Sequence, residues 1–290
     1  MDLQALKIFQ VVAETGSISK AARELNYAQS NVSNKIQQLE AYLQTPLFYR
    51  HNRGITLSVK GQMLLKYTEK IFHLIDETTY AMRDDNIPKG LLCIGSMETI
   101  ATVHLPRLLS MYHKNYPNVD LTLKTGTTEK NINEVLQYNL DGAFVAGPID
   151  HPELVQKTVI DEKLVFITDT SHPTISSIKD IKAPTLLVFP TGCSYRKKLE
   201  QSLHNEGLIP NKIIEFNSLG AIIASVCSGL GISLLPASVV EKYVQAGTLR
   251  CHPIQNSHAN VPIVFIYRKD RFMSKALVKF IDTFSDKENS

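Results

Sequence analysis

The chain has 290 residues, which exceeds the usual length of one domain and predicts at least two folded units. Its composition, 43% hydrophobic and 20% charged with 14 Gly and 13 Pro, excludes a disordered or fibrous chain. The formal net charge of +3 is too small to indicate nucleic-acid binding by itself. The first sixty residues, however, hold seven Lys or Arg against four Asp or Glu, so a basic excess lies near the N-terminus.

The cysteines and the N-terminal residues indicate in which cellular compartment the protein works. The four cysteines form no CxxC pair and no cluster with His at metal-ligand spacing, so we expect reduced thiols, no metal and no cofactor. Residues 1–16 contain an early acid and no small-residue cleavage site, and no apolar run approaches the roughly twenty residues that span a bilayer. We therefore expect a cytoplasmic protein that does not enter a membrane.

Two short helices are predicted at the start of the chain. The first covers residues 2–14, and Ser17 or Ser19 supplies the cap of a second helix that buries Ala21 and Ala22. Apolar residues recur at helical spacing along one face of the first helix: Leu3, Leu6, Phe9, Val12 and Ala13.

The third predicted helix has an apolar face and a polar face. Val32, Ile36, Leu39 and Leu43 recur on the first face at i, i+4, i+7 and i+11. The outer surface carries short amides and hydroxyls suited to base edges, with one cation for the DNA backbone: Gln29, Ser30, Asn31, Ser33, Asn34 and Lys35. Two short helices joined by a tight turn, the second polar outside, are typical of a helix-turn-helix, whose second helix enters the major groove.

A basic turn follows the third helix. Pro46 and Gly54 are turn residues, and Arg50, His51 and Arg53 lie between them, which indicates a wing over a phosphate strand. A polar helix face taken alone is more often merely solvated, but three helices followed by a basic wing favour DNA binding. The candidate DNA-contacting residues are Ser17, Ser19, Gln29, Ser30, Asn31, Ser33, Asn34, Lys35, Arg50 and Arg53.

Residues 58–86 predict one long helix with an apolar stripe that includes Ile71, Leu74 and Met82. At 1.5 Å per residue it would be about 40 Å long, too long to bury against a sixty-residue domain alone. We therefore expect this helix to pair with a second copy of the chain.

From Leu91 onward strands and helices alternate, which favours an α/β domain. Strands are predicted over 91–95, 119–126, 140–148, 163–169, 184–190, 212–216, 232–236 and 261–269. Helices are predicted over 97–117, 127–139, 194–207 and 218–231. The repeated βα units indicate two subdomains of the periplasmic-binding-protein type with a cleft between them.

The whole chain resembles LysR-type transcriptional regulators. The residues that carry the resemblance are Leu6, Phe9, Val12, Gly16 to Ile18, Ala21, Ala22, Leu25, Gln29, Val32, Ser33, Ile36, Leu39, Glu40, Leu43, Pro46 to Phe48, Arg50, Arg53, Leu57, Gly61, Gly95, Pro106, Pro117, Leu140, Asp141, Gly229 to Ile232, Leu235 and Pro236. Ser30, Asn34 and Gln44 depart from the family's pattern, in which Pro, Arg and Gly are common. Asn34 in place of Arg removes a bidentate reader of guanine and would favour adenine or a phosphate.

The resemblance implies a sequence-specific, DNA-binding transcriptional regulator rather than an enzyme. Its expected partners are double-stranded DNA with an interrupted palindrome, a second copy or three further copies of the chain, a small-molecule effector and, as a further candidate, RNA polymerase. The expected fold is α/β with an all-α N-terminal winged helix-turn-helix, a long linker helix and a two-subdomain, periplasmic-binding-protein-like effector domain. We place these at 1–58, 59–87 and 88–290, with subdomain I at 88–161 and 268–290 and subdomain II at 162–267.

Strand ends and helix starts should line the effector cleft. Hydroxyls and free N–H groups at helix N-termini hold anions, so a small carboxylate or oxyanion is the expected effector. The candidate effector-binding residues are Ser96, Thr99, Thr127, Thr128, Gly147, Pro148, Gly192, Cys193, Ser194 and Ser218. The segment 191–198 allows two interpretations: an anion nest to which Arg196 adds charge, or a reactive Cys193 whose pKa is lowered beside that cation.

Two other classes of protein remain open. A cytoplasmic enzyme or solute-binding protein would be marked by a paired acid and base or by a nucleophile with its activating partner, and the sequence shows neither. A regulator without a ligand would have a cleft filled by its own side chains.

Overall fold

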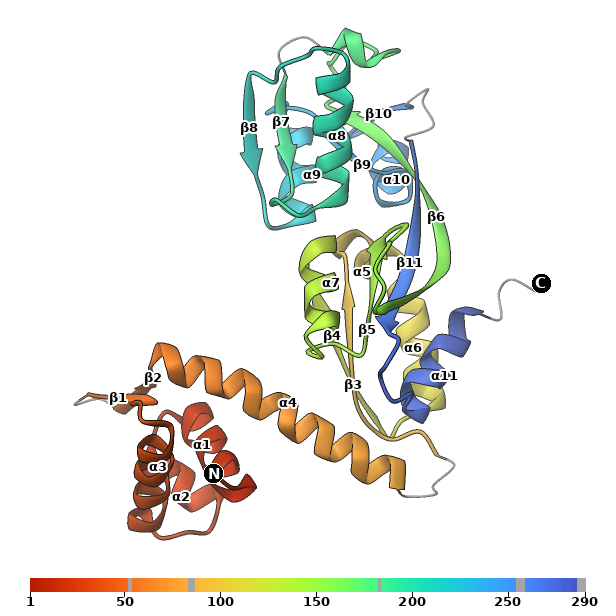
Figure 1. Ribbon diagram of the computed structural model, residues 1–290. Coiled ribbons are helices and arrows are strands. Elements are labelled where there is room, and N and C mark those ends of the chain that lie inside the picture. Colours follow the sequence, from red (N-terminus) through yellow and green to blue (C-terminus); the bar gives the residue numbers. More distant parts are fainter. Residues whose placement is uncertain (52–53, 83–86, 182–183, 254–258, 286–290) are drawn as a thin grey trace. The chain divides into compact units, whose positions relative to one another are not determined.

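Residues 1–51, 54–82, 87–181, 184–253 and 259–285 are described by a computed structural model of the chain (Figure 1). The chain divides into two compact units, Met1–Asp84 and Asp85–Ser290. Within the described ranges, no helix is both long and apolar enough to cross a membrane.

The three predicted helices of the N-terminal unit are present as α1 (Leu3–Thr15), α2 (Ile18–Glu24) and α3 (Gln29–Leu43). Gly16 ends α1 in the left-handed conformation, with φ 61°, and the Ser17 hydroxyl caps α2 by accepting the Lys20 N–H at 3.4 Å. Leu3 differs from expectation: as the first residue of α1 it is 50% exposed. The buried apolar residues that join the three helices include Leu6, Phe9, Val12, Ala21, Ala22, Val32, Ile36 and Leu39.

A two-stranded wing follows α3. Strands β1 (Phe48–His51) and β2 (Gly54–Leu57) pair antiparallel, and α4 (Val59–Met82) comes next. The Glu40 carboxylate accepts the N–H groups of Leu47 at 2.7 Å and Phe48 at 3.3 Å, which fastens the end of α3 to the wing. Gln44 ends α3 with φ 51°, a conformation that favours glycine, which explains why glycine is common there in the family that the sequence resembles.

The C-terminal unit folds into two halves, and the first half also includes the last helix of the chain. This first half is a sheet covered by helices on both faces (Figure 1). Strand β3 (Gly90–Ser96) lies between β4 (Val119–Thr125) and β5 (Gly142–Ala146) and runs parallel to both. Helices α6 (Leu105–Asn115) and α11 (Lys275–Ser285) pack together on one face, and α7 (Thr128–Leu136) packs on the other.

The prediction of a single helix over 97–117 is wrong, because the structure has two helices there. Helix α5 (Glu98–Val103) ends at His104, and α6 begins at Leu105. Pro106 has no N–H to donate to the preceding turn, so the helical hydrogen bonds cannot continue through it.

The second half is built on its own strands. β9 (Ser233–Pro236) and β10 (Arg250–Pro253) pair with the end of β6 (Leu154–Thr168), while β7 (Thr185–Val188) pairs with β8 (Lys212–Glu215). The helices of this half are α8 (Ser194–Asn205), α9 (Leu219–Cys227) and α10 (Ala237–Gln245), with a 3₁₀ turn η1 (Ile178–Asp180). The predicted elements include neither α10 nor β10 nor α11.

One long strand, β6, runs through both halves. β6 pairs with β11 (Asn260–Arg268) along 154–163 and with β9 along 164–167, so one continuous strand joins the two sheets. β11 also pairs with β5. Residues 260–267, which the sequence analysis assigns to subdomain II, therefore belong to the sheet of the first half.

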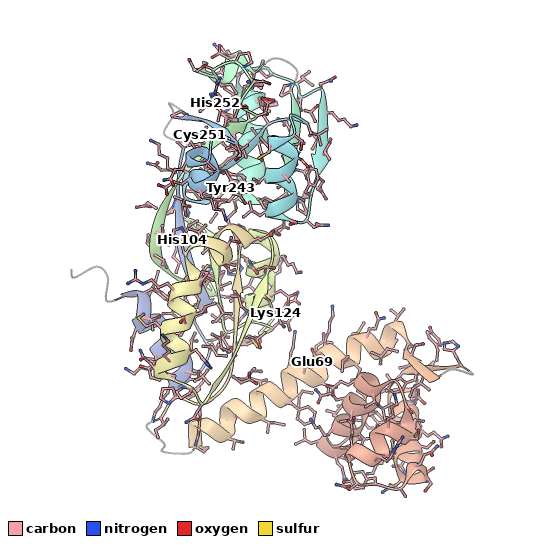
Figure 2. The ribbon with its side chains drawn as sticks, turned by 180° about the vertical axis from the view of Figure 1, so that it is seen from behind. Glu69, His104, Lys124, Tyr243, Cys251 and His252 are labelled. Atoms are coloured by element: carbon pink, nitrogen blue, oxygen red, sulfur yellow. The ribbon has the colours of Figure 1, made fainter. Side chains whose placement is uncertain are left out.

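Two buried carboxylates tie distant segments of this unit together. Asp141 forms an ion pair with Arg271 and accepts the Cys93 N–H at 2.6 Å. Glu162, which is 4% exposed, is bonded to His104 and accepts the Ser238 hydroxyl at 2.9 Å. His104, labelled in Figure 2, thus joins the end of α5 to a carboxylate on β6 that also holds α10.

His252 on β10, also labelled in Figure 2, is buried in its neutral form. Its Nδ1 accepts the Ile175 N–H at 3.1 Å, and its Nε2 lies 3.0 Å from the Thr168 hydroxyl, which itself donates to the Asp169 carbonyl. Nε2 therefore carries the proton. Burial, with the nearby charges of His172 and Arg250, lowers the pKa of His252 below its usual 6.5.

We expect this histidine to make the C-terminal unit acid-sensitive. The unfolded chain takes up the proton near pH 6.5 and the folded chain only at lower pH, so the free energy of unfolding falls as the pH drops from 6.5 through the folded-state pKa of His252. In urea titrations between pH 7.5 and 5, His252→Asn should flatten this fall. His113→Asn, at an exposed position on α6, should leave it unchanged, and an equal slope in wild type and His252→Asn would contradict the assignment.

Candidate functional sites

The polar face of α3 is open to solvent. Gln29, Ser30, Asn31 and Asn34 are exposed and Ser33 is half-buried. Within the described part of the chain, none of these five side chains has a hydrogen-bond partner. Their amides and hydroxyls are therefore free to meet a ligand, while Val32, Ile36 and Leu39 hold the helix from behind.

The other residues proposed to contact DNA differ in their exposure and in their hydrogen-bond partners. Ser17 caps α2 and its hydroxyl lies 3.0 Å from that of Ser19, so both stand at the start of one helix. Lys35 is half-buried and pairs with Asp2 at 3.5 Å, which offsets part of its charge. Arg50 lies on β1, but its side chain is outside the described part of the structure, as is the whole of Arg53.

A cavity of about 500 Å³ lies between the two halves of the C-terminal unit. It opens where the parallel strands β3 and β4 end, the edge at which α/β sheets usually bind ligands. The first half contributes Met97, Glu98, Thr99, Thr125, Gly126, Thr127, Thr128 and Lys130. The second half contributes Phe189, Pro190, Thr191, Cys193, Tyr195 and Asn217.

The ten predicted effector residues fall in three places. Thr99, Thr127, Thr128 and Cys193 line this cavity. A larger groove of about 1030 Å³ is lined by Thr128, Cys193 and four other predicted residues: Gly147, Pro148, Gly192 and Ser194. Ser96 and Ser218 line neither: Ser96 is fully buried and donates to the Met97 carbonyl at 2.9 Å, and Asn217 lines the cavity in place of Ser218.

Sequence reasoning missed several lining residues. Glu98 lies between the chosen residues Ser96 and Thr99, and Lys130 lies two positions after the chosen Thr128. Phe189 and Pro190 follow β7 directly, and no pattern in the sequence marked this strand end as part of the site.

Hydrogen bonds cross between the halves around the cavity. The Glu98 carboxylate accepts the Leu219 N–H at 3.0 Å, and the hydroxyls of Thr99 and Tyr195 lie 3.4 Å apart. The Glu129 N–H donates to the Gly192 carbonyl at 3.3 Å. These hydrogen bonds therefore hold the two walls of the cavity in one arrangement. A ligand could replace them with hydrogen bonds of its own.

Part of the expected anion nest at 191–198 is already satisfied, because the Cys193 N–H donates to the Pro190 carbonyl at 3.2 Å. On α7, the Lys130 N–H donates to the Thr127 hydroxyl at 3.3 Å. Arg196 does not point a free charge at a ligand, because it bonds to Glu200 at 2.8 Å and to Glu215 at 2.5 Å. Within the described residues, the hydroxyls of Thr125 and Thr191 remain without a partner.

Cys193 does not have the environment of a reactive thiol. Burial raises the pKa of Cys193, whereas a redox-active or nucleophilic cysteine needs a lowered pKa. Burial raises the pKa of Tyr195 as well, so both groups are uncharged at neutral pH. The described residues contain no group of three or more His, Cys, Asp or Glu placed to hold a metal ion.

Two family models match the chain. The bacterial regulatory helix-turn-helix protein, lysR family, matches residues 3–62, and the LysR substrate binding domain matches residues 86–288. The fold and the two sites thus define a helix-turn-helix transcriptional regulator with a substrate-binding domain. The chain belongs to the LysR family.

Relatives and a solved structure agree with this assignment. The chain is 54% identical over 286 residues to the HTH-type transcriptional regulator GltR of Bacillus subtilis (strain 168), covering 99% of this chain and 97% of GltR. It is 48% identical over 288 residues to the HTH-type transcriptional regulator CzcR of Bacillus anthracis, covering 99% of this chain and 98% of CzcR. The crystal structure of full-length CbnR complexed with its target DNA has the same fold, with a TM-score of 0.71 at 24% identity over 99% of both chains.

Proposed function

We propose that this LysR-type regulator reads its DNA site with α3 and the wing, and that a small carboxylate or oxyanion held in the cavity of the C-terminal unit controls it. The DNA part is supported by the exposed, unpartnered polar face of α3 and by CbnR, a protein of the same fold solved on its target DNA. An α-helix presents such a face to base edges in the major groove. The site would be an interrupted palindrome.

The cavity itself carries the effector proposal. Its volume of about 500 Å³ is in the range of small-molecule sites. The hydroxyls of Thr125 and Thr191 and the ammonium of Lys130 are among the donors in this wall that can meet an anion. Hydrogen bonds such as that from the Leu219 N–H to Glu98 join the two halves at this cavity, so a ligand that replaces them can favour a different arrangement of the halves.

The anion proposal is tested by thermal shift of the purified full chain against carboxylates, inorganic oxyanions, sugars and amines. We expect stabilisation by one class of carboxylate or oxyanion, and Thr191→Val should reduce it. Stabilisation only by amines or sugars would contradict the proposal.

We also propose that α4 pairs with the α4 of a second copy. Ile71, Leu74, Ile75, Thr78, Thr79 and Met82 line one open groove along this helix. Leu74 is 49% exposed and Met82 is 79% exposed, which leaves an apolar face that a second helix would cover. Homodimers built in this way, or tetramers made from two of them, would place two copies of α3 on one palindrome.

Charged residues in this groove should yield monomers. In size-exclusion chromatography with light scattering, the wild type should run as a dimer or tetramer and Ile71→Glu with Leu74→Glu as a monomer, because two carboxylates would have to be buried in the interface. Val59→Glu, at a 72% exposed position of α4 outside the groove, is the matched control. An oligomer that survives the double substitution would refute this interface.

A further inference from the structure

The cavity of the C-terminal unit has two charged side chains in its wall, and their charges are opposite. Glu98 lies at the start of α5 and Lys130 in the first turn of α7. The other two ionisable groups in the wall, Cys193 and Tyr195, are uncharged at neutral pH because burial raises the pKa of each. The wall therefore presents one negative and one positive group to whatever it binds.

The Glu98 carboxylate is held in place through one of its two oxygens. Its Oε1 accepts the Leu219 N–H, the first N–H of α9, at 3.0 Å. Within the described part of the chain, no donor lies at Oε2. Ser218 caps α9 with no side-chain hydrogen bond of its own, so Glu98 fills that role from the opposite half. One oxygen of this carboxylate is thus fixed and the other is free to accept from a ligand.

Lys130 is positioned by its own contacts on the other side of the wall. Its N–H donates to Thr127, and its aliphatic stem lies against Gly126, where a Cβ would come within 3.2 Å of the Lys130 Cδ. Within the described residues, no carboxylate pairs with its ammonium. The free hydroxyls of Thr125 and Thr191 line the same cavity.

Glu98 disfavours a simple anion in this wall. At about 6 Å and an effective dielectric constant of about 20, Glu98 alone would weaken the binding of a carboxylate by roughly a hundredfold, and the attraction of Lys130 offsets this repulsion. A simple anion therefore gains little net binding from the two charges. An amino group on the same ligand would turn that repulsion into attraction.

We propose that the effector is a zwitterion of the amino-acid type, with its ammonium on Glu98 Oε2 and its carboxylate on Lys130 and the threonine hydroxyls. The inference rests on the proposed function, because it takes this cavity as the effector site. It adds that the ligand needs a cationic group as well as an anionic one.

The test compares ligands that differ only in the amino group. Isothermal titration of the purified full chain would use pairs such as leucine and 4-methylpentanoate, phenylalanine and 3-phenylpropanoate, and glutamate and pentanedioate, with the matching amines. We expect at least one amino acid to bind tenfold or more tightly than its deaminated partner. Glu98→Gln, which keeps an acceptor for the Leu219 N–H, should weaken that amino acid about tenfold and bring the two members of the pair within about threefold.

Glu129→Gln is the matched control, because Glu129 is a carboxylate on α7 that lines the neighbouring groove and not this cavity. It should leave both affinities unchanged. The melting temperature of unliganded Glu98→Gln separates a loss of ligand contact from a loss of folding.

Two results would overturn the inference in different ways. If the deaminated acid binds as tightly as the amino acid and Glu98→Gln leaves the pair unchanged, the zwitterion is wrong and the anionic effector stands. If neither member of any pair binds, the amino-acid-type zwitterion is wrong and the thermal-shift test decides the anionic effector by itself. If only the amines bind, both the inference and the proposed anionic effector fail.

Discussion

Replacing Asp141 with asparagine is expected to lower the free energy of unfolding of the C-terminal unit by about 3–5 kcal/mol. Asp141 and Arg271 form an ion pair whose side chains are 5% and 3% exposed. Asparagine has the same size but no charge, so the buried Arg271 guanidinium would lose the charge of the Asp141 carboxylate. Urea unfolding of the full chain, followed by a probe of the C-terminal unit, measures the effect.

Two further variants isolate the cause. Asp282→Asn removes an exposed carboxylate that pairs with Lys279 at 3.0 Å, and we expect less than about 0.5 kcal/mol because solvent screens that pair. Asp141→Asn combined with Arg271→Met should recover part of the loss, since both charges of this pair are then removed. If Asp141→Asn unfolded within about 1 kcal/mol of the wild type, the buried pair would not be what fixes the segment before α11 to the sheet.

The second large effect concerns DNA. Gln29→Ala is expected to reduce the preference for the specific site over altered sites by about 1–3 kcal/mol, because glutamine can bond both hydrogen-bonding positions of an adenine edge. Gln29 is exposed at the first turn of α3, the end of a recognition helix that contacts base edges. Titration of the selected site and of its single-base variants measures the change.

Gln38→Ala is the matched control within the same helix. Gln38 is also an exposed glutamine, but it lies nine positions after Gln29, about 13 Å further along the axis. Its replacement should leave the discrimination between sequences unchanged. If Gln29→Ala preserved the discrimination as well, the N-terminal turn of α3 would not be the reading surface.

The N-terminal unit could be predicted closely because its signals are local. Helix caps such as Ser17, the turn at Gly16 and the i, i+4 spacing of Val32 and Ile36 are all set by neighbouring residues, and α1, α2 and α3 follow them. The C-terminal unit was harder. The first part of β6 is rich in polar residues, and it is a strand because β11 pairs with it, which no local pattern shows.

The lining of the cavity could likewise be predicted only where residues close together in the sequence determine it. Sequence reasoning could name Thr127 and Thr128, at the helix start that follows β4, since the C-terminal edge of parallel strands is a general binding position. It could not tell which ends converge. Glu98 meets Leu219, 121 positions away, and that contact follows from the packing of the two halves.

The measurement that tests the central claim most directly is genome-wide mapping of the DNA bound by the purified protein over a salt titration. We predict enrichment of a few palindromic sites whose binding persists at physiological salt, with affinity that falls steeply as salt rises because phosphate contacts release counterions. The genes beside those sites would then name compounds to test in the cavity. Binding that is absent, or uniform across sequences at physiological salt, would contradict sequence-specific recognition by α3.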